Sequence, residues 1–281
     1  MRSRLFAALF ASAALLLADF TPKWNQPIVP YRVVPNVYYV GTNYLASFLI
    51  TTPQGAVLIN PNYQESVPLI RANVEKLGLH FSDIKIILIS HAHDDHAAGC
   101  ALMKKLTGAK LMVMDADVAE IENGGATDFA YASRWPPAKV DRVLHDGDRV
   151  TLGGITLTAH LTPGHTKGCT TWTTEIKDGA HLLHVVIVGS PNVNPGYKLV
   201  GNRQYPQIAA DYEKMFRVLA SLPCDVFLGA HGSYYDMDDK LKRLRAGAAN
   251  PFIDPEGYRA YVKERKQAFQ TELSAQQHPA K

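Results

Sequence analysis

The sequence predicts a single α/β domain, built as a four-layer αββα sandwich. The order strands, helix, strand, helix occurs twice along the chain, which indicates two similar halves of mixed sheet with helices outside. Segments 84–90 and 224–231 are continuous apolar runs, as is typical of strands covered on both faces. The 281 residues, 47% hydrophobic and 20% charged, are enough for one large core.

The first half begins with strands and continues into helices. Strands are expected at 36–41, 46–52, 55–60 and 84–90. A helix is predicted over 63–77, where apolar residues recur at helical spacing, and Gly78 is a suitable C-terminal cap. A second helix is expected from about Asp95 to Leu106, ending near Gly108.

The second half repeats this order. Segment 148–165 predicts hairpin strands, and segment 169–190 predicts two more, with a turn at Asp178 and Gly179. A helix carrying Ile208 and Leu219 on its apolar face, a buried strand and a polar helix follow, at about 208–219, 224–231 and 255–273.

Residues 1–18 are predicted to be a secretory signal peptide, and residues 19–281 the single folded domain. Two arginines precede an apolar run from Leu5 to Ala18, which is short for a membrane span of about 20 residues. A membrane anchor or a buried helix is the alternative. Cleavage is expected after Ala18, and a neighbouring cleavage site is also possible because Leu16, the third residue back from the cut, is less typical than alanine at that position. We therefore expect an exported, periplasmic protein with no membrane partner after cleavage.

Charge and cysteine content restrict the partners. The formal net charge of +3 is too small to favour nucleic acid or a membrane surface. Three cysteines, Cys100, Cys169 and Cys224, leave at least one thiol free in an exported monomer, and a monomer is expected. Their spacing matches no local metal motif, so buried small side chains are the favoured interpretation.

Histidines stand at the carboxyl ends of three apolar stretches. His91 follows the strand 84–90, His165 ends the stretch 159–165, and His231 ends the stretch 224–231. Loops at strand ends are where a rigid sheet points functional groups at a common cleft. We expect the three histidines to meet in such a cleft.

The stretch ILISHAHDDHAAG, residues 87–99, crowds three histidines and two aspartates into six positions. Neutral imidazole and carboxylate are good zinc ligands. His91 and His93 are two apart, so an extended segment sends both to one side, whereas Asp95 and His96 at a helix entry can face a second point. A single tetrahedral zinc cannot use every group, so the pattern indicates two metals that share Asp95 and five histidines, three ligands each.

These residues resemble the metallo-β-lactamase superfamily. His91 to His96 match its HxHxDH signature, and TPGHT and GAHG match its later histidine positions. HLTPGHTKGCTTW, GSPNVNPGYKLVGN, YPQIAADY and NPFIDPEGY are similar to subclass B3, so the resemblance covers essentially the whole mature chain. It implies the metallo-β-lactamase fold and two Zn²⁺ per chain, one held by His91, His93 and His165 and the other by Asp95, His96 and His231.

The resemblance also implies an activity. It points to a class B, subclass B3 β-lactamase, a zinc hydrolase that opens the amide bond of penicillins, cephalosporins and carbapenems with a dizinc-activated hydroxide and confers β-lactam resistance. Asp95 would orient the hydroxide. Ser190, Asn194 and Tyr197 would bind the small-molecule substrate, with simple turn formation as the alternative.

Another dizinc hydrolase of the same fold, a glyoxalase II-like thioesterase or a lactonase, is the alternative function. In those relatives an aspartate usually bridges the metals, whereas Ser190 occupies that position here. The segment 122–137 is expected to be a flap with apolar contacts from Phe129, Tyr131 and Trp135, or an ordinary packed loop.

Three positions depart from the family pattern. Asp94 replaces a common aromatic residue and either alters the charge beside the ligands or caps the helix start. Asn60 replaces a common aspartate, which is expected to weaken a hydrogen bond that supports the ligands. Tyr258 stands where some relatives carry a cysteine, so Cys224 is predicted to be unpaired.

Overall fold

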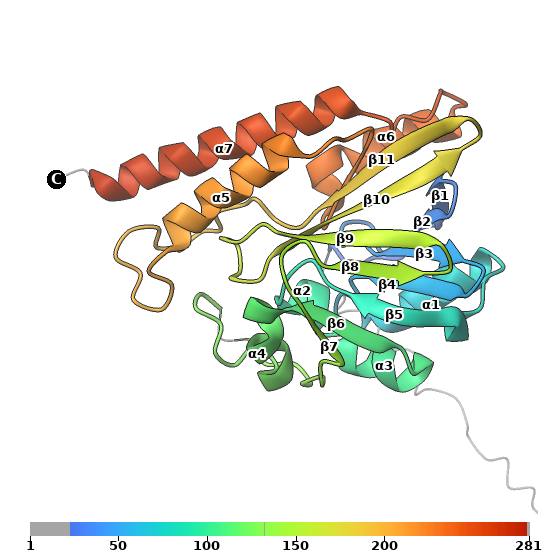
Figure 1. Cartoon of the computed structure of the whole chain (residues 1–281), viewed down its shortest axis with the longest axis horizontal. Helices are drawn as coiled ribbons and strands as arrows, with labels where there is room; N and C mark the ends of the chain where they lie inside the picture. Colours follow the sequence, from blue (N-terminus) through green and yellow to red (C-terminus); the bar gives the residue numbers. More distant parts are fainter. Residues whose placement is uncertain (1–22, 132, 280–281) are drawn as a thin grey trace, which may run out of the picture.

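Two β-sheets pack face to face in the computed structural model, which describes residues 23–131 and 133–279 (Figure 1). The predicted signal peptide lies outside the described residues. The seven-stranded sheet follows chain order: β1 Tyr31–Val34, β2 Val37–Tyr39, β3 Phe48–Thr52, β4 Gly55–Ile59, β5 Ile84–Leu88, β6 Lys110–Met114 and β7 Arg142–Leu144. The five-stranded sheet has the order β12 Val226–Gly229, β11 His181–Val188, β10 Thr170–Asp178, β9 Ile155–Leu161 and β8 Arg149–Leu152.

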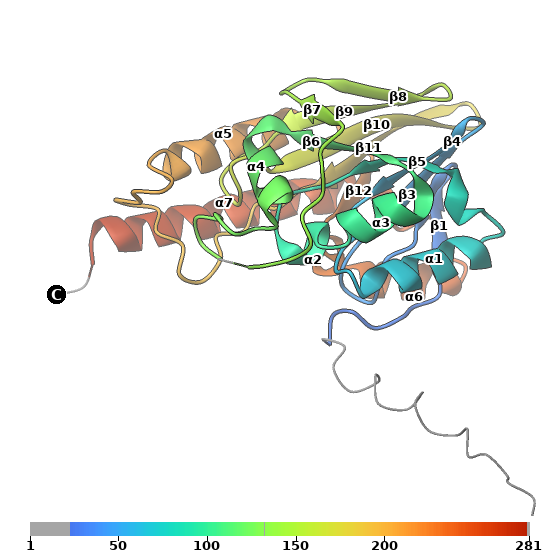
Figure 2. The same ribbon diagram turned by 90° about the horizontal axis from the view of Figure 1, so that it is seen from below.

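Helices form the two outer layers, so the predicted αββα sandwich is confirmed (Figure 2). The helices are α1 Ser66–Lys76, α2 Asp94–Ala97, α3 Cys100–Thr107, α4 Asp115–Asn123, α5 Ile208–Ser221, α6 Met237–Arg245 and α7 Pro255–Gln277, with 3-10 turns η1 Phe81–Asp83 and η2 Gly232–Tyr235. One apolar cluster joins α1 and α3 to the outer face of the seven-stranded sheet, and the other fills the space between the sheets and below α5 and α7. Among the described residues no helix is long and apolar enough to cross a membrane.

Most predicted elements are present at the predicted places. The apolar run of β5 lies between the parallel neighbours β4 and β6, which explains why four of its five residues are buried. Gly78 follows α1 with a φ of 74°, as a C-terminal cap requires. The hairpin of β10 and β11 is present, but its turn is formed by Gly179 and Ala180, one position later than predicted, because Asp178 still pairs with His181.

The single helix predicted from Asp95 to Leu106 is wrong, because the chain breaks it into α2 and α3 at Gly99. The Gly99 N–H donates to Asn62 O at 2.7 Å. A Cβ on Gly99 would lie 2.7 Å from Pro61 O and 2.9 Å from Tyr63 O, so only glycine allows this approach. The short α2, which carries Asp95 and His96, therefore ends before α3 begins.

Two hydrogen bonds tie the end of β5 to the second sheet. The Trp172 indole N–H donates to Ile89 O at 2.9 Å, and the Thr170 N–H donates to Ser90 O at 2.7 Å. Ser90 immediately precedes His91. The segment that carries the clustered histidines is therefore fixed between the two sheets, beside the loop that follows β9.

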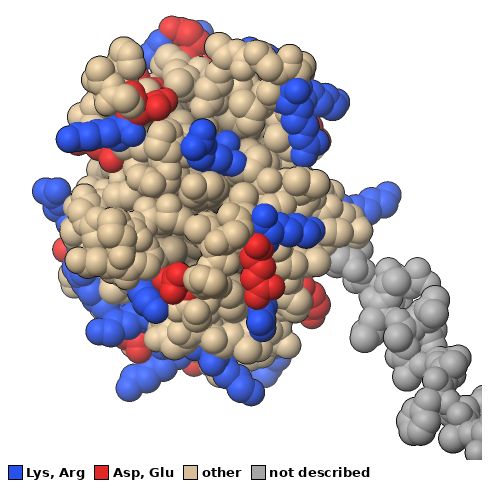
Figure 3. All heavy atoms as spheres, turned by 90° about the vertical axis from the view of Figure 1, so that its right-hand side faces the viewer, with Lys and Arg blue, Asp and Glu red and all other residues tan. Residues whose placement is uncertain are grey.

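Charged side chains of both signs occur on the face of the molecule that is viewed from the right-hand side of Figure 1. On the face shown in Figure 3, basic and acidic groups are interspersed among other residues. This distribution accords with a net charge of only +3.

Candidate metal centre

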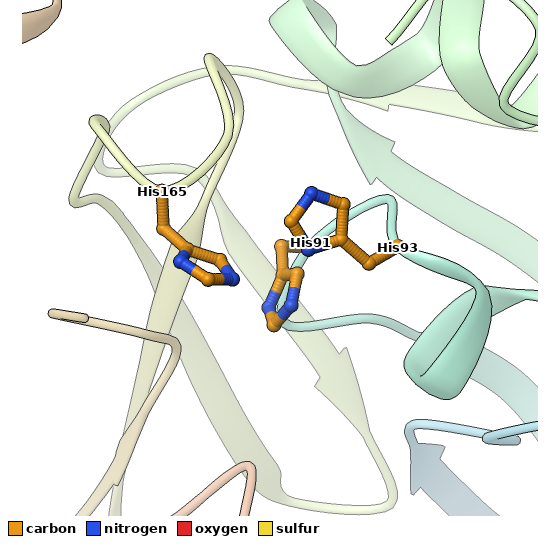
Figure 4. A group of neighbouring side chains, drawn as sticks. All are labelled: His91, His93 and His165. Atoms are coloured by element: carbon orange, nitrogen blue, oxygen red, sulfur yellow. The ribbon is translucent and has the colours of Figure 1, made fainter. Parts of the chain in front are cut away.

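Three histidines form a buried cluster where the chain leaves β5 and β9 (Figure 4). His91 and His93 follow β5, and His165 lies in the loop between β9 and β10. The His91 ring centroid is 4.9 Å from that of His93 and 4.6 Å from that of His165. One ring nitrogen of each lies within 4.8 Å of the others, which is an arrangement that one cation can bridge.

The hydrogen bonds of this cluster leave ring nitrogens free for a cation. His165 Nδ1 lies 2.8 Å from Asn192 O, which can only accept, so Nδ1 carries the proton and Nε2 keeps its lone pair. His91 Nδ1 contacts Ser90 Oγ at 3.1 Å. Nε2 of His91 and of His93 is buried without a hydrogen-bond partner in the described part of the chain. Buried polar atoms of this kind are rare, and a bound metal would satisfy them.

A second cluster adjoins the first. Asp95 Oδ2 lies 3.3 Å from His96 Nε2 and 3.6 Å from His231 Nε2, and the two histidine nitrogens are 3.1 Å apart. His91 also offers a nitrogen within 4.8 Å of ligand atoms of Asp95 and His96, so it stands between the two clusters. All six candidate ligands are thus brought together, as two groups of three.

Electrostatics keep these groups in the protonation states that metal binding needs. Burial lowers the pKa of His93 to about 4, and it lowers the pKa of His165 and of His231 to about 3 with help from neighbouring histidines. Burial alone would raise the pKa of Asp95, but His96 and His231 hold that pKa well below its usual range. The neutral imidazoles of His93, His165 and His231 therefore lie near one ionised carboxylate at neutral pH.

These pKa values predict that the metal-free protein loses stability on acidification. His93, His165 and His231 have folded pKa values below the ordinary value of about 6.5, so unfolding takes up protons between about pH 6.5 and pH 4. The urea midpoint of the metal-free protein is expected to fall between pH 7 and pH 5. An unaltered midpoint in the parent protein would contradict the prediction.

Comparison with known proteins decides the family. The family model of the metallo-beta-lactamase superfamily matches residues 41–231. The chain belongs to the metallo-β-lactamase superfamily. The native FEZ-1 metallo-β-lactamase from Legionella gormanii is 52% identical to it, with a TM-score of 0.89 over 90% of this chain and 98% of that chain. BJP-1, a subclass B3 metallo-β-lactamase of Bradyrhizobium japonicum, is 39% identical, with a TM-score of 0.85 over 91% of this chain and 97% of that chain. The predicted membership of subclass B3 is confirmed.

Other members of the superfamily are similar over shorter stretches. A hydroxyacylglutathione hydrolase of Cereibacter sphaeroides is 39% identical over 82 residues, which are 29% of this chain and 26% of that protein. A probable metallo-hydrolase of Burkholderia pseudomallei is 29% identical over 115 residues, 37% of its length. The chain therefore matches only about a third of the length of these curated relatives.

The three residues predicted to bind substrate have different surroundings in this B3 protein. Ser190 is buried, and its Oγ lies 2.9 Å from the Tyr234 hydroxyl. Tyr197 is also buried, and its hydroxyl donates to His165 O at 2.9 Å. Asn194 is half-buried beside Tyr131, which makes it the most accessible of the three.

Segment 122–137 is packed only in part, because most of its described residues are exposed, and one of its aromatic residues lies beside the site. Trp135 is buried, and Phe129 lies against Tyr197 and Tyr205. Tyr131 is 38% exposed, and its ring centroid is 5.6 Å from that of His93. Of the three predicted apolar contacts, Tyr131 alone lies beside a candidate ligand.

The departures from the superfamily pattern have local explanations. His93 is the N-terminal cap residue of α2, and Asp94 is the first residue of that helix. The Oδ1 atom of Asp94 accepts the Asp95 N–H at 2.8 Å. Asn60 keeps the supporting hydrogen bond, because its Oδ1 accepts the Ser90 N–H at 2.7 Å. The predicted state of Cys224 is confirmed, since all three cysteines are free thiols.

Several residues around the B3 centre give no recognisable signal in the sequence. Asp128 Oδ2 lies 3.8 Å from His93 Nε2, and Asn192 O accepts from both His165 and Tyr212. Asp117 is buried behind the first cluster. Only the tertiary fold brings these residues to the histidines.

Proposed function

We propose that this protein is a periplasmic β-lactamase that hydrolyses the amide bond of penicillins, cephalosporins and carbapenems, with two Zn²⁺ as cofactor, and so confers β-lactam resistance. The support comes from two directions. Proteins described as metallo-β-lactamases match almost the whole chain at up to 52% identity. The donors of the two clusters also form two sets of three, and three protein ligands per zinc are typical of catalytic sites.

The six candidate ligands would divide between two metals. His91, His93 and His165 would hold one zinc, and Asp95, His96 and His231 the other. When bound, the two zinc ions would supply a hydroxide nucleophile near neutral pH and polarise the lactam carbonyl.

The side chains of the protein would prepare this reaction. Asp95 is ionised at neutral pH and can accept a hydrogen bond from the attacking water, which orients it. Asn192 O fixes the His165 ring through Nδ1. Asn194 would contact the substrate carboxylate, and the buried Ser190 and Tyr197 would contribute by shaping the same loop.

The observation that carries this assignment is the residue at the end of β11. Thioesterases and lactonases of the superfamily usually place a bridging aspartate there, whereas this chain has Ser190, and its Oγ contacts the Tyr234 hydroxyl. No acid follows in the sequence until Asp211. A bridging carboxylate would add a negative charge between the metals. Without it, a metal held by Asp95, His96 and His231 would be more open to the leaving lactam nitrogen.

The maturation of the chain is part of the proposal. Residues 1–18 would direct export and be removed, which leaves residues 19–281 as one domain that acts as a monomer on small-molecule substrates.

Steady-state hydrolysis assays test the function directly. The zinc-loaded protein is expected to open a penicillin, a cephalosporin and a carbapenem, to lose this activity with EDTA, and to resist clavulanate, which needs a serine to acylate. S-lactoylglutathione and a homoserine lactone serve as controls and should be poor substrates. Efficient cleavage of either control, with no opening of any β-lactam, would refute the assignment.

A further inference from the structure

A buried carboxylate outside the candidate ligand set holds the first histidine cluster together. Asp117 lies on α4 and is 1% exposed. Its Oδ2 accepts the Ala92 N–H at 2.9 Å and the Thr166 hydroxyl at 2.8 Å, and its Oδ1 accepts the Gly168 N–H at 2.8 Å. Three donors thus converge on a single side chain.

The positions of these donors connect Asp117 to all three histidines of the first cluster. Ala92 lies between His91 and His93, and Thr166 directly follows His165. The two chain segments that supply the cluster are therefore joined through one carboxylate. A shift of α4 would therefore disturb both the segment that carries His91 and His93 and the segment that carries His165.

The neighbouring backbone is adapted to this carboxylate. A Cβ on Gly168 would lie 2.6 Å from Asp117 N and 2.7 Å from both Asp117 Cβ and Cγ, so any larger residue would push α4 away. A glycine is needed here for close approach and not for an unusual φ angle.

In the described residues, no positively charged side chain balances the carboxylate of Asp117. Only a cation bound in the adjacent histidine cluster would supply a balancing charge. No lysine, arginine or histidine in the described ranges forms an ion pair with it. Burial raises its pKa to about 6, against the lowering effect of Thr166, Gly168 and Ala92. A buried carboxylate of this kind is costly unless a cation lies nearby, and a cation between the three histidines would provide compensation.

We propose that Asp117 is the positioning residue of the first metal site, which fixes His91, His93 and His165 in one arrangement and adds negative charge behind them. The inference rests on the proposed division of the metal ligands. It concerns metal affinity at one site, so it is separable from the choice of substrate.

Replacement by asparagine tests the inference because it preserves the size of the side chain. All three partners of Asp117 donate, whereas an amide offers only one acceptor oxygen, so Asp117→Asn places an N–H₂ group against a backbone N–H. Loss of a residue that orients metal ligands typically costs about 10- to 100-fold in metal affinity. We expect a loss of that size at the first site and little change at the second.

Titration of the metal-free protein with Zn²⁺ against a chromophoric chelator measures both affinities, and Co²⁺ spectra report the geometry of each site. Asp115→Asn is the matched control, because Asp115 lies exposed on the same helix. Thr166→Val removes one hydrogen bond and keeps the charge, so it should give a smaller, several-fold loss. It also provides the test if Asp117→Asn does not fold.

The outcomes separate this inference from the proposed function. Equal first-site affinity and unchanged Co²⁺ spectra in the parent protein, Asp117→Asn and Thr166→Val would overturn the role of Asp117. Equal losses at both sites would also overturn it, because they would indicate general loosening. A parent protein that binds two zinc ions but opens no β-lactam would refute the function alone.

Discussion

Replacing Asp95 by asparagine is expected to lower kcat/KM for a β-lactam about a thousandfold. Asp95 is the one carboxylate among the six candidate ligands, and it lies 3.3 Å from His96 and 3.6 Å from His231. The amide would remove the negative charge of the second site and its ability to orient the attacking water. Steady-state kinetics together with elemental analysis check this result, with about two zinc ions per chain in the parent protein and about one in the variant.

Asp94→Asn is the control for this experiment. Asp94 is adjacent in sequence, but its Oδ1 contacts the Asp95 backbone and no ligand atom in the described contacts. The control should change kcat/KM by less than about tenfold. Parent-like turnover in Asp95→Asn, or a parent protein that holds at most one zinc after loading, would exclude the dinuclear mechanism.

Trp172→Ala is expected to lower the free energy of unfolding by about 4 kcal/mol. Trp172 is fully buried in the core between the two sheets, and its indole N–H donates to Ile89 O at 2.9 Å. Truncation would leave a large cavity and free the backbone two residues before His91. Urea unfolding of the metal-free protein provides the measurement.

Trp172→Phe separates the two contributions of this side chain. It keeps an aromatic ring in the core and removes the hydrogen bond, so a smaller loss of about 1–2 kcal/mol is expected. If Trp172→Ala cost less than Trp172→Phe, the packing account of this core would be wrong.

The strand ends and the clustered ligands could be predicted because both are local features of the sequence. The apolar run of β5 and the residues from His91 to His96 are contiguous, so their chemistry and spacing can be read together. The histidines at 165 and 231 also follow apolar stretches. The geometry of the site agrees with the expectation that these residues meet.

The remaining features depend on tertiary contacts that no short pattern encodes. Asp117 lies in DADVAEIEN, whose polar composition is typical of a solvent-exposed helix. The strand β6 before it contains two methionines, which give little strand signal. Neither element was predictable from periodicity. The break at Gly99 likewise arises from the approach of Pro61 and Tyr63, which are distant in sequence. The inward orientation of Ser190 depends on Tyr234, which belongs to η2.

The second cluster also has a consequence for when metal can enter the protein. His96 and His231 are 135 residues apart in sequence, yet their ring nitrogens are 3.1 Å apart. This pair exists only after both halves of the sandwich have packed, so the unfolded chain has no preformed second site. A chain exported before folding would reach its compartment without a complete metal centre. Its metal content would then record the zinc supply outside the cytoplasm, and zinc scarcity there would limit the active fraction without changing the amount of folded protein.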